Sequence, residues 1–210
     1  MPGKRTLLGP LALLLAACSG GTDAPTLTAA QTSFNQTAAS AATLQANIKA
    51  MPPLTVMPNS GSANFAGYAG LTYTNAAAQR TELLSLANLS ANFGTSKVTG
   101  SLATFVGGTV TDPKTNSIAN PLPYIGNLTL ANGTIGPGNA LTANVSGTLT
   151  TIGQKVVVNS TVKGGFVGNP LQGVEADTAQ AASASLPGTT VTVNGVAQQS
   201  PTLFIVGRKQ

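Results

Sequence analysis

An all-β fold is predicted by three features: the alternation of apolar and polar residues after residue 53, the turn signals between the alternating segments, and the number of those segments. The expected architecture is a single eight-stranded antiparallel β-barrel at 54–210, preceded by a leader and an N-terminal helix. Apolar side chains at every second position place one face of a strand in a core and the other in water. Clusters of Gly, Pro, Asn and Ser mark the turns.

The first 17 residues have the form of a secretory signal. "MPGKR" carries two positive charges and "TLLGPLALLLAA" follows without a charge, which are the basic and apolar regions of such a signal. The apolar run is shorter than the about 20 residues that a membrane-spanning helix needs. Leu15, Ala16 and Ala17 precede Cys18, and "LAAC" resembles the lipobox of bacterial lipoproteins. The resemblance implies a lipoprotein signal peptide at 1–17 and lipid attachment at Cys18.

Cys18 is the only cysteine in the chain. Two other interpretations are an ordinary signal peptide with a chance cysteine and a buried structural thiol. The second is disfavoured because 18–26 read as a flexible linker. Two or three acyl chains would hold the protein stably on a membrane. By resemblance to Gram-negative lipoproteins, Ser19 favours sorting to the outer membrane, with the periplasmic face and the cell surface both open.

Composition excludes some partners. Only 7% of the 210 residues are charged, and neither His nor Trp occurs. Without Lys4 and Arg5 of the leader, eight basic and five acidic side chains remain. The basic residues are scattered singly, whereas nucleic-acid binding uses clustered Lys and Arg. No nucleic-acid partner is therefore expected.

Residues 27–50 contain neither Gly nor Pro and are predicted to form a helix. The apolar positions that recur every seven residues are Leu27, Phe34, Ala41 and Ile48. This spacing gives one apolar stripe, and "MPP" at 51–53 ends the helix. The stripe is consistent with a stalk helix that packs on the domain or with a short coiled coil that oligomerises.

Period-two alternation is clearest at 140–149, where Leu141, Val145 and Leu149 point one way and Thr and Asn side chains point the other. The eight predicted strands are 62–74, 83–93, 96–105, 124–135, 140–150, 155–167, 171–182 and 201–208, of which the seventh has the weakest pattern.

These strands are expected to close into a barrel because closure leaves no unpaired sheet edge. An open antiparallel sheet would leave two edges that can aggregate, and eight strands close around an interior just wide enough for side chains. The alternative of a transmembrane barrel is disfavoured, because outward positions carry Thr, Asn, Ser and Lys in place of an apolar band with aromatic girdles.

Several stretches together resemble the β-barrel domain of transferrin-binding protein B, as found in small transferrin-binding protein-like surface lipoproteins of Gram-negative bacteria. The stretches are "ANFAGYAGL" (63–71), "LSANFGTSKVTGSL" (89–102), "ALTANVSGTL" (140–149), "VKGGFVGNPLQGVEA" (162–176) and "FIVGRKQ" (204–210). The resemblance covers about 58–210 and implies a lipid-anchored binding protein with a barrel fold. Val167 and Leu171 depart from the family pattern, and 184–196 reads as an insert. Transferrin itself is not carried over as a ligand, because the receptor's handle domain and second lobe are absent.

Catalysis is not expected, because His is absent and the only Cys is assigned to lipid attachment, so the common base and nucleophile pairs are missing. Glu175 and Asp177 share one face of a strand, which allows a carboxylate pair, although two solvated carboxylates are the plainer interpretation. The acidic residues are too few for a calcium loop, so no metal and no cofactor is expected.

The kind of function that remains is recognition of a partner through loops on a rigid barrel. The three candidate loops are 75–82, 106–123 and 184–201. Of these, 106–123 is long and polar and ends beside an aromatic residue of the type found in interface anchors. The candidate ligand-binding residues are Arg80, Asp112, Lys114 and Tyr124. The sequence thus predicts a lipid-anchored outer-membrane or surface protein that binds a host or environmental protein, and the alternative is a structural envelope lipoprotein with no specific ligand.

Overall fold

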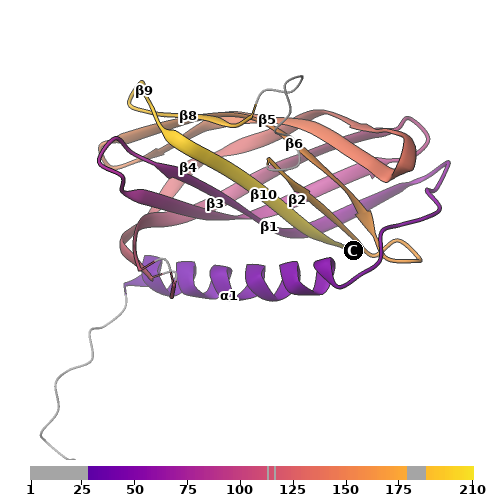
Figure 1. Cartoon of the computed structure of the whole chain (residues 1–210), viewed down its shortest axis with the longest axis horizontal. Helices are drawn as coiled ribbons and strands as arrows, with labels where there is room; N and C mark the ends of the chain where they lie inside the picture. Colours follow the sequence, from indigo (N-terminus) through magenta and orange to yellow (C-terminus); the bar gives the residue numbers. More distant parts are fainter. Residues whose placement is uncertain (1–27, 113, 116, 179–187) are drawn as a thin grey trace, which may run out of the picture.

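The computed structural model describes residues 28–112, 114–115, 117–178 and 188–210. Leu15, Ala16, Ala17 and Cys18 lie outside the described residues. The described elements are α1 (Ala29–Lys49), β1 (Ser62–Thr74), β2 (Arg80–Asn92), β3 (Lys97–Asp112), β4 (Ser117–Ile135), η1 (Pro137–Asn139), β5 (Ala140–Thr151), β6 (Gln154–Val167), β7 (Gly173–Asp177), β8 (Thr190–Val193), β9 (Val196–Ala197) and β10 (Gln199–Lys209). Strands dominate, with a single α-helix in this part of the chain (Figure 1).

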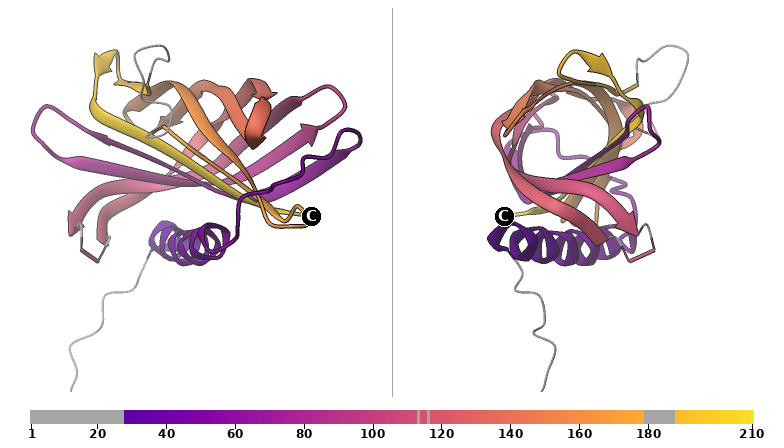
Figure 2. Two further views of the ribbon diagram at one scale, coloured as in Figure 1. Left: turned by 45° about the vertical axis from the view of Figure 1, so that its right-hand side comes forward. Right: turned by 90° about the vertical axis from the view of Figure 1, so that its left-hand side faces the viewer.

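Eight strands form a closed antiparallel barrel, as predicted. Each strand from β1 to β6 pairs with the next, β7 pairs with β6 and β10, and β10 returns to β1. The end-on view of Figure 2 shows this ring with α1 beneath it. β8 pairs with Val156–Asn159 of β6, on the edge that pairs with β7 at Lys163–Val167, and β9 pairs with β8; the strands of this hairpin are not among the eight strands of the ring.

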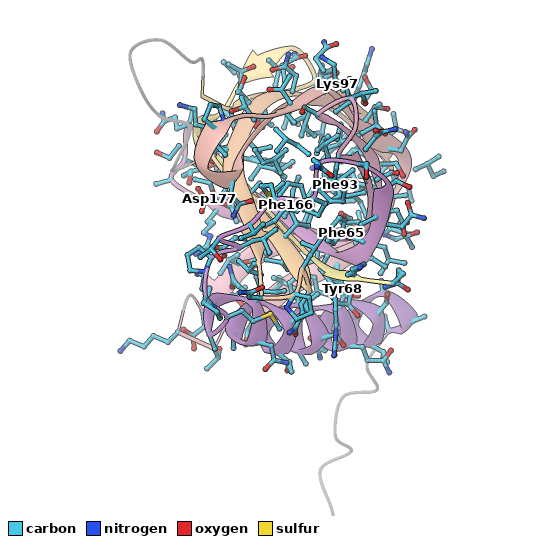
Figure 3. All side chains as sticks on the ribbon, turned by 90° about the vertical axis from the view of Figure 1, so that its right-hand side faces the viewer. Phe65, Tyr68, Phe93, Lys97, Phe166 and Asp177 are labelled. Atoms are coloured by element: carbon cyan, nitrogen blue, oxygen red, sulfur yellow. The ribbon has the colours of Figure 1, made fainter. Side chains whose placement is uncertain are left out.

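The barrel interior is filled by side chains. The inward positions predicted for 140–149 are buried in β5, and Val156, Val158, Val162 and Phe166 are buried in β6. At one end Phe166 contacts two other rings, with centroid distances of 5.6 Å to Phe65 and 5.8 Å to Phe93. Figure 3 shows these three rings inside the barrel. The interior is therefore a packed core, as predicted for a narrow barrel.

The aromatic end is also fixed by a side-chain clamp on the backbone. Asn139, in η1 between β4 and β5, donates a hydrogen bond from Nδ2 to the Phe166 carbonyl at 2.5 Å and accepts one from the Phe166 N–H at 2.9 Å. Asn139 is buried and has a φ of 71°, a conformation that Asn tolerates better than most residues. This pair of hydrogen bonds holds the β4–β5 connection against β6.

The predicted helix is confirmed and packs on the barrel. The Thr28 hydroxyl caps its N-terminus by accepting a hydrogen bond from the Gln31 N–H at 3.1 Å. Phe34, Ala41 and Ile48 are buried, so the apolar stripe faces the outer walls of the strands. The stripe is consequently covered by this chain's own barrel, which favours the packed helix over the coiled coil. Leu27, the first member of the predicted stripe, lies outside the described residues.

Antiparallel pairing gathers alternate connections at each end of the barrel. The turn 75–79 after β1, the tip between Asp112 and Ser117, the turn 152–153 after β5 and the turn 194–195 between β8 and β9 share one end. We call this end the loop rim. It is on the left in Figure 1, where α1 also begins. The opposite end holds the aromatic contacts of Phe166.

The prediction of a long loop at 106–123 is wrong. β3 and β4 continue as a paired hairpin from Val106 opposite Pro123 to Asp112 opposite Ser117. Pro121 and Pro123 lack an N–H, which disfavours them inside a strand. The ladder accommodates them with register shifts, and Val106 and Ile118 bury their outer side chains with Phe34 of α1. Burial against the helix thus extends the hairpin.

The other loop predictions are corrected in a similar way. The loop 75–82 shortens to 75–79 because Arg80 begins β2. The segment 184–201 contains β8, β9 and the start of β10. Its residues 184–187 lie outside the described part. The predicted seventh strand, 171–182, is the short β7, and its residues 179–182 also lie outside that part. The eighth predicted strand, 201–208, lies within β10.

Candidate functional site

The candidate residues Arg80, Asp112 and Lys114 lie at the loop rim, and the fourth candidate, Tyr124, lies inside the barrel. Arg80 is the first residue of β2, and Asp112 is the last of β3. Lys114 follows in the tip of the β3–β4 hairpin and is exposed. The structure therefore brings three of the four to one end of the molecule by strand geometry.

Arg80 is held by a neighbouring carboxylate. Its Nη2 lies 3.3 Å from Oε2 of Glu82, and the Glu82 side chain is nearly buried while that of Arg80 is 44% exposed. Residues two apart on a strand point to the same face, so the two side chains run together along the outer wall of β2. Arg80 can still present its exposed edge to an anionic group, but part of its charge is already balanced.

Asp112 organises the tip of the hairpin. Its Oδ1 accepts the Lys114 N–H at 2.9 Å and its Oδ2 accepts the Thr115 hydroxyl at 2.9 Å. The Lys114 N–H and then the Thr115 hydroxyl lower the pKa of the Asp112 carboxyl, because both donate to its ionised form. The two oxygens thus serve the turn, and the exposed Lys114 remains available to a partner.

Tyr124 is not a surface anchor, which corrects the prediction. It is inward-facing and buried, and its hydroxyl donates to Oε1 of Gln154 at 3.2 Å. Tyr73 hydrogen-bonds both Tyr124 and Thr81 inside the same mouth of the barrel. Burial raises the pKa of both tyrosines. The alternation of β4 places Tyr124 inward, whereas a loop at 106–123 would leave it exposed at the end of that loop.

A groove opens between α1 and the β3–β4 tip at the loop rim. Its volume is about 520 Å³. The residues that line it are Gln31, Phe34, Asn35, Ala38, Thr115, Ser117 and Ile118. Phe34 and Ile118 form an apolar floor, and the amide and hydroxyl groups provide donors and acceptors at the edge. Such a groove can take an apolar side chain of a partner and orient it by neutral hydrogen bonds.

Glu175 and Asp177 are half-buried on the outer face of β7. Lys163 of β6 lies opposite Asp177, and Gly165 lies opposite Glu175. The arrangement puts a cation beside one member of the pair. The two carboxylates thus share one face of β7, as the sequence predicts, with the Lys163 side of β6 next to Asp177.

The described residues lack two features that would point to other functions. No group of three or more His, Cys, Asp or Glu in the described part is placed to hold a metal ion. Among the same residues, no helix has both the length and the apolar character needed to span a membrane.

Sequence analysis missed the groove because it arises from two segments about eighty residues apart that meet only in the folded chain. The Thr81–Tyr73–Tyr124–Gln154 hydrogen-bond chain was missed for the same reason. By contrast, "NG" at 194–195 is a strong hairpin signal that could have located β8 and β9. The chain matches no family model, no curated protein and no solved structure.

Proposed function

We propose that the protein is a lipid-anchored binding protein of the outer membrane, tethered through Cys18, that recognises a protein partner through its loop rim. The observation that carries the proposal is the packed interior of the barrel. Because side chains fill the barrel, a ligand cannot be enclosed as in a cup-shaped barrel, and recognition falls to the outer surface.

The groove between α1 and the β3–β4 tip is the proposed contact. It combines an apolar floor with neutral polar edges, and the exposed Lys114 stands beside it on the same tip. Rigid strands and a packed helix hold both walls, so little order has to be created on binding. The resemblance to transferrin-binding protein-like lipoproteins supports the same class of function, without transferrin as the ligand.

The alternative proposal is a structural envelope lipoprotein that has no specific ligand. The outward Thr, Asn and Ser side chains of β5 and β6 favour it, because a polar and sparsely charged wall suits a protein that only coats a surface. The two proposals differ in whether a saturable partner exists.

Substitutions in the groove test the proposal without removing strand residues. Asn35→Trp fills the groove from its α1 side, and Gln36→Trp adds the same ring at an exposed position on the far side of the helix. The intact chain and both variants are immobilised and exposed to surface-protein extracts, and bound proteins are quantified over a concentration series. Circular dichroism verifies that each variant is folded.

The proposal expects a saturable partner for the wild type and for Gln36→Trp, and loss of that partner for Asn35→Trp. Equal capture by both variants would remove the groove as the contact. A wild type that captures nothing saturably would favour the structural alternative. Separately, the mass of the wild type extracted from membranes should show acyl chains on Cys18, and the mass of Cys18→Ser should lack them.

A further inference from the structure

Three large aliphatic side chains are exposed at one corner of the loop rim. Ile152 is 88% exposed, Ile125 is 78% exposed and Val196 is 62% exposed. Ile152 occupies the turn between β5 and β6, and Ile125 lies on β4 opposite Thr150, two residues from Ile152. Val196 begins β9, which lies beyond β8 on the edge of β6. Consecutive strands β4, β5, β6, β8 and β9 thus carry these side chains along one stretch of the loop rim. We call Ile125, Ile152 and Val196 the apolar corner.

The two turns of the corner are fastened to each other. Asn194, in the β8–β9 turn, donates from Nδ2 to the Gly153 carbonyl at 3.0 Å and accepts the Lys155 N–H at 2.8 Å. The Asn194 N–H also donates to the Lys155 carbonyl at 2.8 Å. Asn194 and Gly195 both have positive φ, as a tight two-residue hairpin turn requires. The apolar tips are therefore carried on a rigid support, and neither tip is free to fold back and bury itself.

The charge of the corner is positive. Lys155 is exposed beside the β5–β6 turn. In the described residues, the acidic side chains are Glu82, Asp112, Glu175 and Asp177, and all four belong to β2, β3 and β7. A cation next to aliphatic tips, without a neighbouring carboxylate, suits a surface that has anionic head groups above an apolar layer.

The apolar corner lies at the same end of the barrel as the start of α1. α1 begins at the loop rim, so the first described residue, Thr28, lies at this end (Figure 1). Ten residues run from Cys18 to residue 27, and such a segment spans at most about 33–36 Å when fully extended. An acylated Cys18 would hold the loop rim within that distance of the bilayer, where exposed aliphatic side chains can enter it.

We propose that the apolar corner rests on the lipid surface and orients the barrel on the membrane. The inference rests on the proposed function only for the tether at Cys18. In the ring of eight strands, the β5–β6 turn lies opposite the β1–β2 turn, so contact at the corner directs Arg80 away from the lipid. In the described residues, the main contacts of α1 are with β1 to β4, β7 and β10, and not with β5, β6, β8 or β9. The groove beside α1 therefore stays clear of the β5–β6 and β8–β9 turns and remains accessible to a partner.

Vesicle binding without the acyl chain tests the corner alone. The mature chain carrying Cys18→Ser is mixed with vesicles of phosphatidylethanolamine and phosphatidylglycerol, and the bound fraction is measured by co-sedimentation. One variant adds Ile152→Asn and Val196→Asn. The matched control adds Val56→Asn and Leu86→Asn, which replace two exposed aliphatic side chains outside the corner. Circular dichroism and thermal unfolding verify that both are folded.

We expect the Cys18→Ser chain to bind these vesicles, the corner variant to bind about tenfold more weakly or worse, and the control to bind like its parent. Absence of binding by the Cys18→Ser chain, or equal losses in the two variants, would overturn the inference. A corner variant that keeps vesicle binding but loses a captured protein would assign the corner to a protein partner and also overturn it. Failure of acylation is detected independently by the mass of the wild type from membranes, so failure of the tether and failure of the corner are distinguishable.

Discussion

The Ser85 hydroxyl is a polar group buried in the barrel wall. Ser85 is fully buried in β2, at the point where the register with β3 shifts. Within the described part of the chain its Oγ has no hydrogen-bond partner. A buried hydroxyl left without a partner costs about 1–3 kcal/mol. The folded protein is therefore less stable with Ser85 than it would be with a residue of similar size that has no hydroxyl.

Ser85→Ala is expected to stabilise the protein by about 1 kcal/mol, because it removes the uncompensated hydroxyl and little volume. For a chain of this size such a change raises the Tm by about 2–4 °C. Urea unfolding and thermal unfolding measure the effect. Ser160→Ala is the control, because the Ser160 hydroxyl is hydrogen-bonded to Thr189 at 2.8 Å. It should lower the stability, and a stabilising Ser160→Ala would refute the explanation.

The buried tyrosines make stability depend on alkaline pH. Burial raises the pKa of Tyr73 above the value of 10.0 that it has in the unfolded chain, and it raises that of Tyr124 as well. The neutral phenols are therefore favoured in the folded state. Their contribution to stability is fully present below pH 10 and is lost as the pH rises toward the folded-state pKa. The free energy of unfolding should consequently fall above pH 10.

The combined change Tyr73→Phe and Tyr124→Phe should weaken this alkaline decline, at the expense of about 1 kcal/mol per lost hydrogen bond at neutral pH. Urea unfolding of the wild type and the variant at a series of pH values measures the difference, and phenolate absorbance reports ionisation directly. If both proteins lose stability equally above pH 10, other groups cause the decline.

At the scale of elements, α1 and the β3–β4 hairpin stabilise each other. Phe34 forms a cluster with Leu84, Val106 and Ile118 on the outside of the barrel. Without the helix, these three strand residues would expose apolar surface to water. The helix in turn would have no partner for its stripe, and most of the stability of a helix in a protein comes from packing its apolar face. The two elements therefore form one cooperative unit.

Phe34→Ala is expected to destabilise the protein by about 3–5 kcal/mol, because it leaves a cavity under the helix. Urea unfolding measures the loss, and limited proteolysis should show earlier cleavage within α1. Gln36→Ala, at an exposed position on the same helix, should change the stability by less than about 0.5 kcal/mol. An unchanged cleavage pattern in Phe34→Ala would contradict the proposed coupling.

At the scale of the whole molecule, β7 is the shortest strand of the ring. It has only five residues, and it joins β6 to β10. Gly164 of β6 lies opposite Ala176, where a Cβ on Gly164 would be 1.8 Å from the Glu175 carbonyl oxygen. Glycine at this position therefore lets the two backbones approach and the ring close.

Gly164→Ala is expected to destabilise the barrel by about 3 kcal/mol or more, since the added methyl group meets backbone that cannot move without opening the β6–β7 pair. In the Gly164→Ala variant, the backbone amides of β7 should exchange hydrogen faster than those of β2. Gly94→Ala is the control, because its Cβ would lie at ordinary contact distances of 3.6 Å and beyond. Equal effects of the two substitutions would argue against crowding as the cause.

The sequence by itself determined the repeating local patterns. Alternation identified the inward side chains of β5 and the positions of the other long strands, and the absence of Gly and Pro together with the stripe at Phe34, Ala41 and Ile48 identified α1. These features depend on neighbours within a few residues, where the period of the backbone fixes which side chains share a face. The count of eight strands then predicted closure, because an open sheet of this length would leave its edges unpaired.

Only the tertiary structure decided where strands end and which polar residues are buried. The segment 106–123 has the Gly and Pro content of a loop, but pairing across the hairpin and burial against α1 keep it extended. Tyr124 became an inward residue for the same reason, and the groove beside Asn35 exists only because the helix returns to the hairpin. The physical reason is that strand pairing and burial are contacts between distant segments, whose free energy is not contained in the local pattern of either segment.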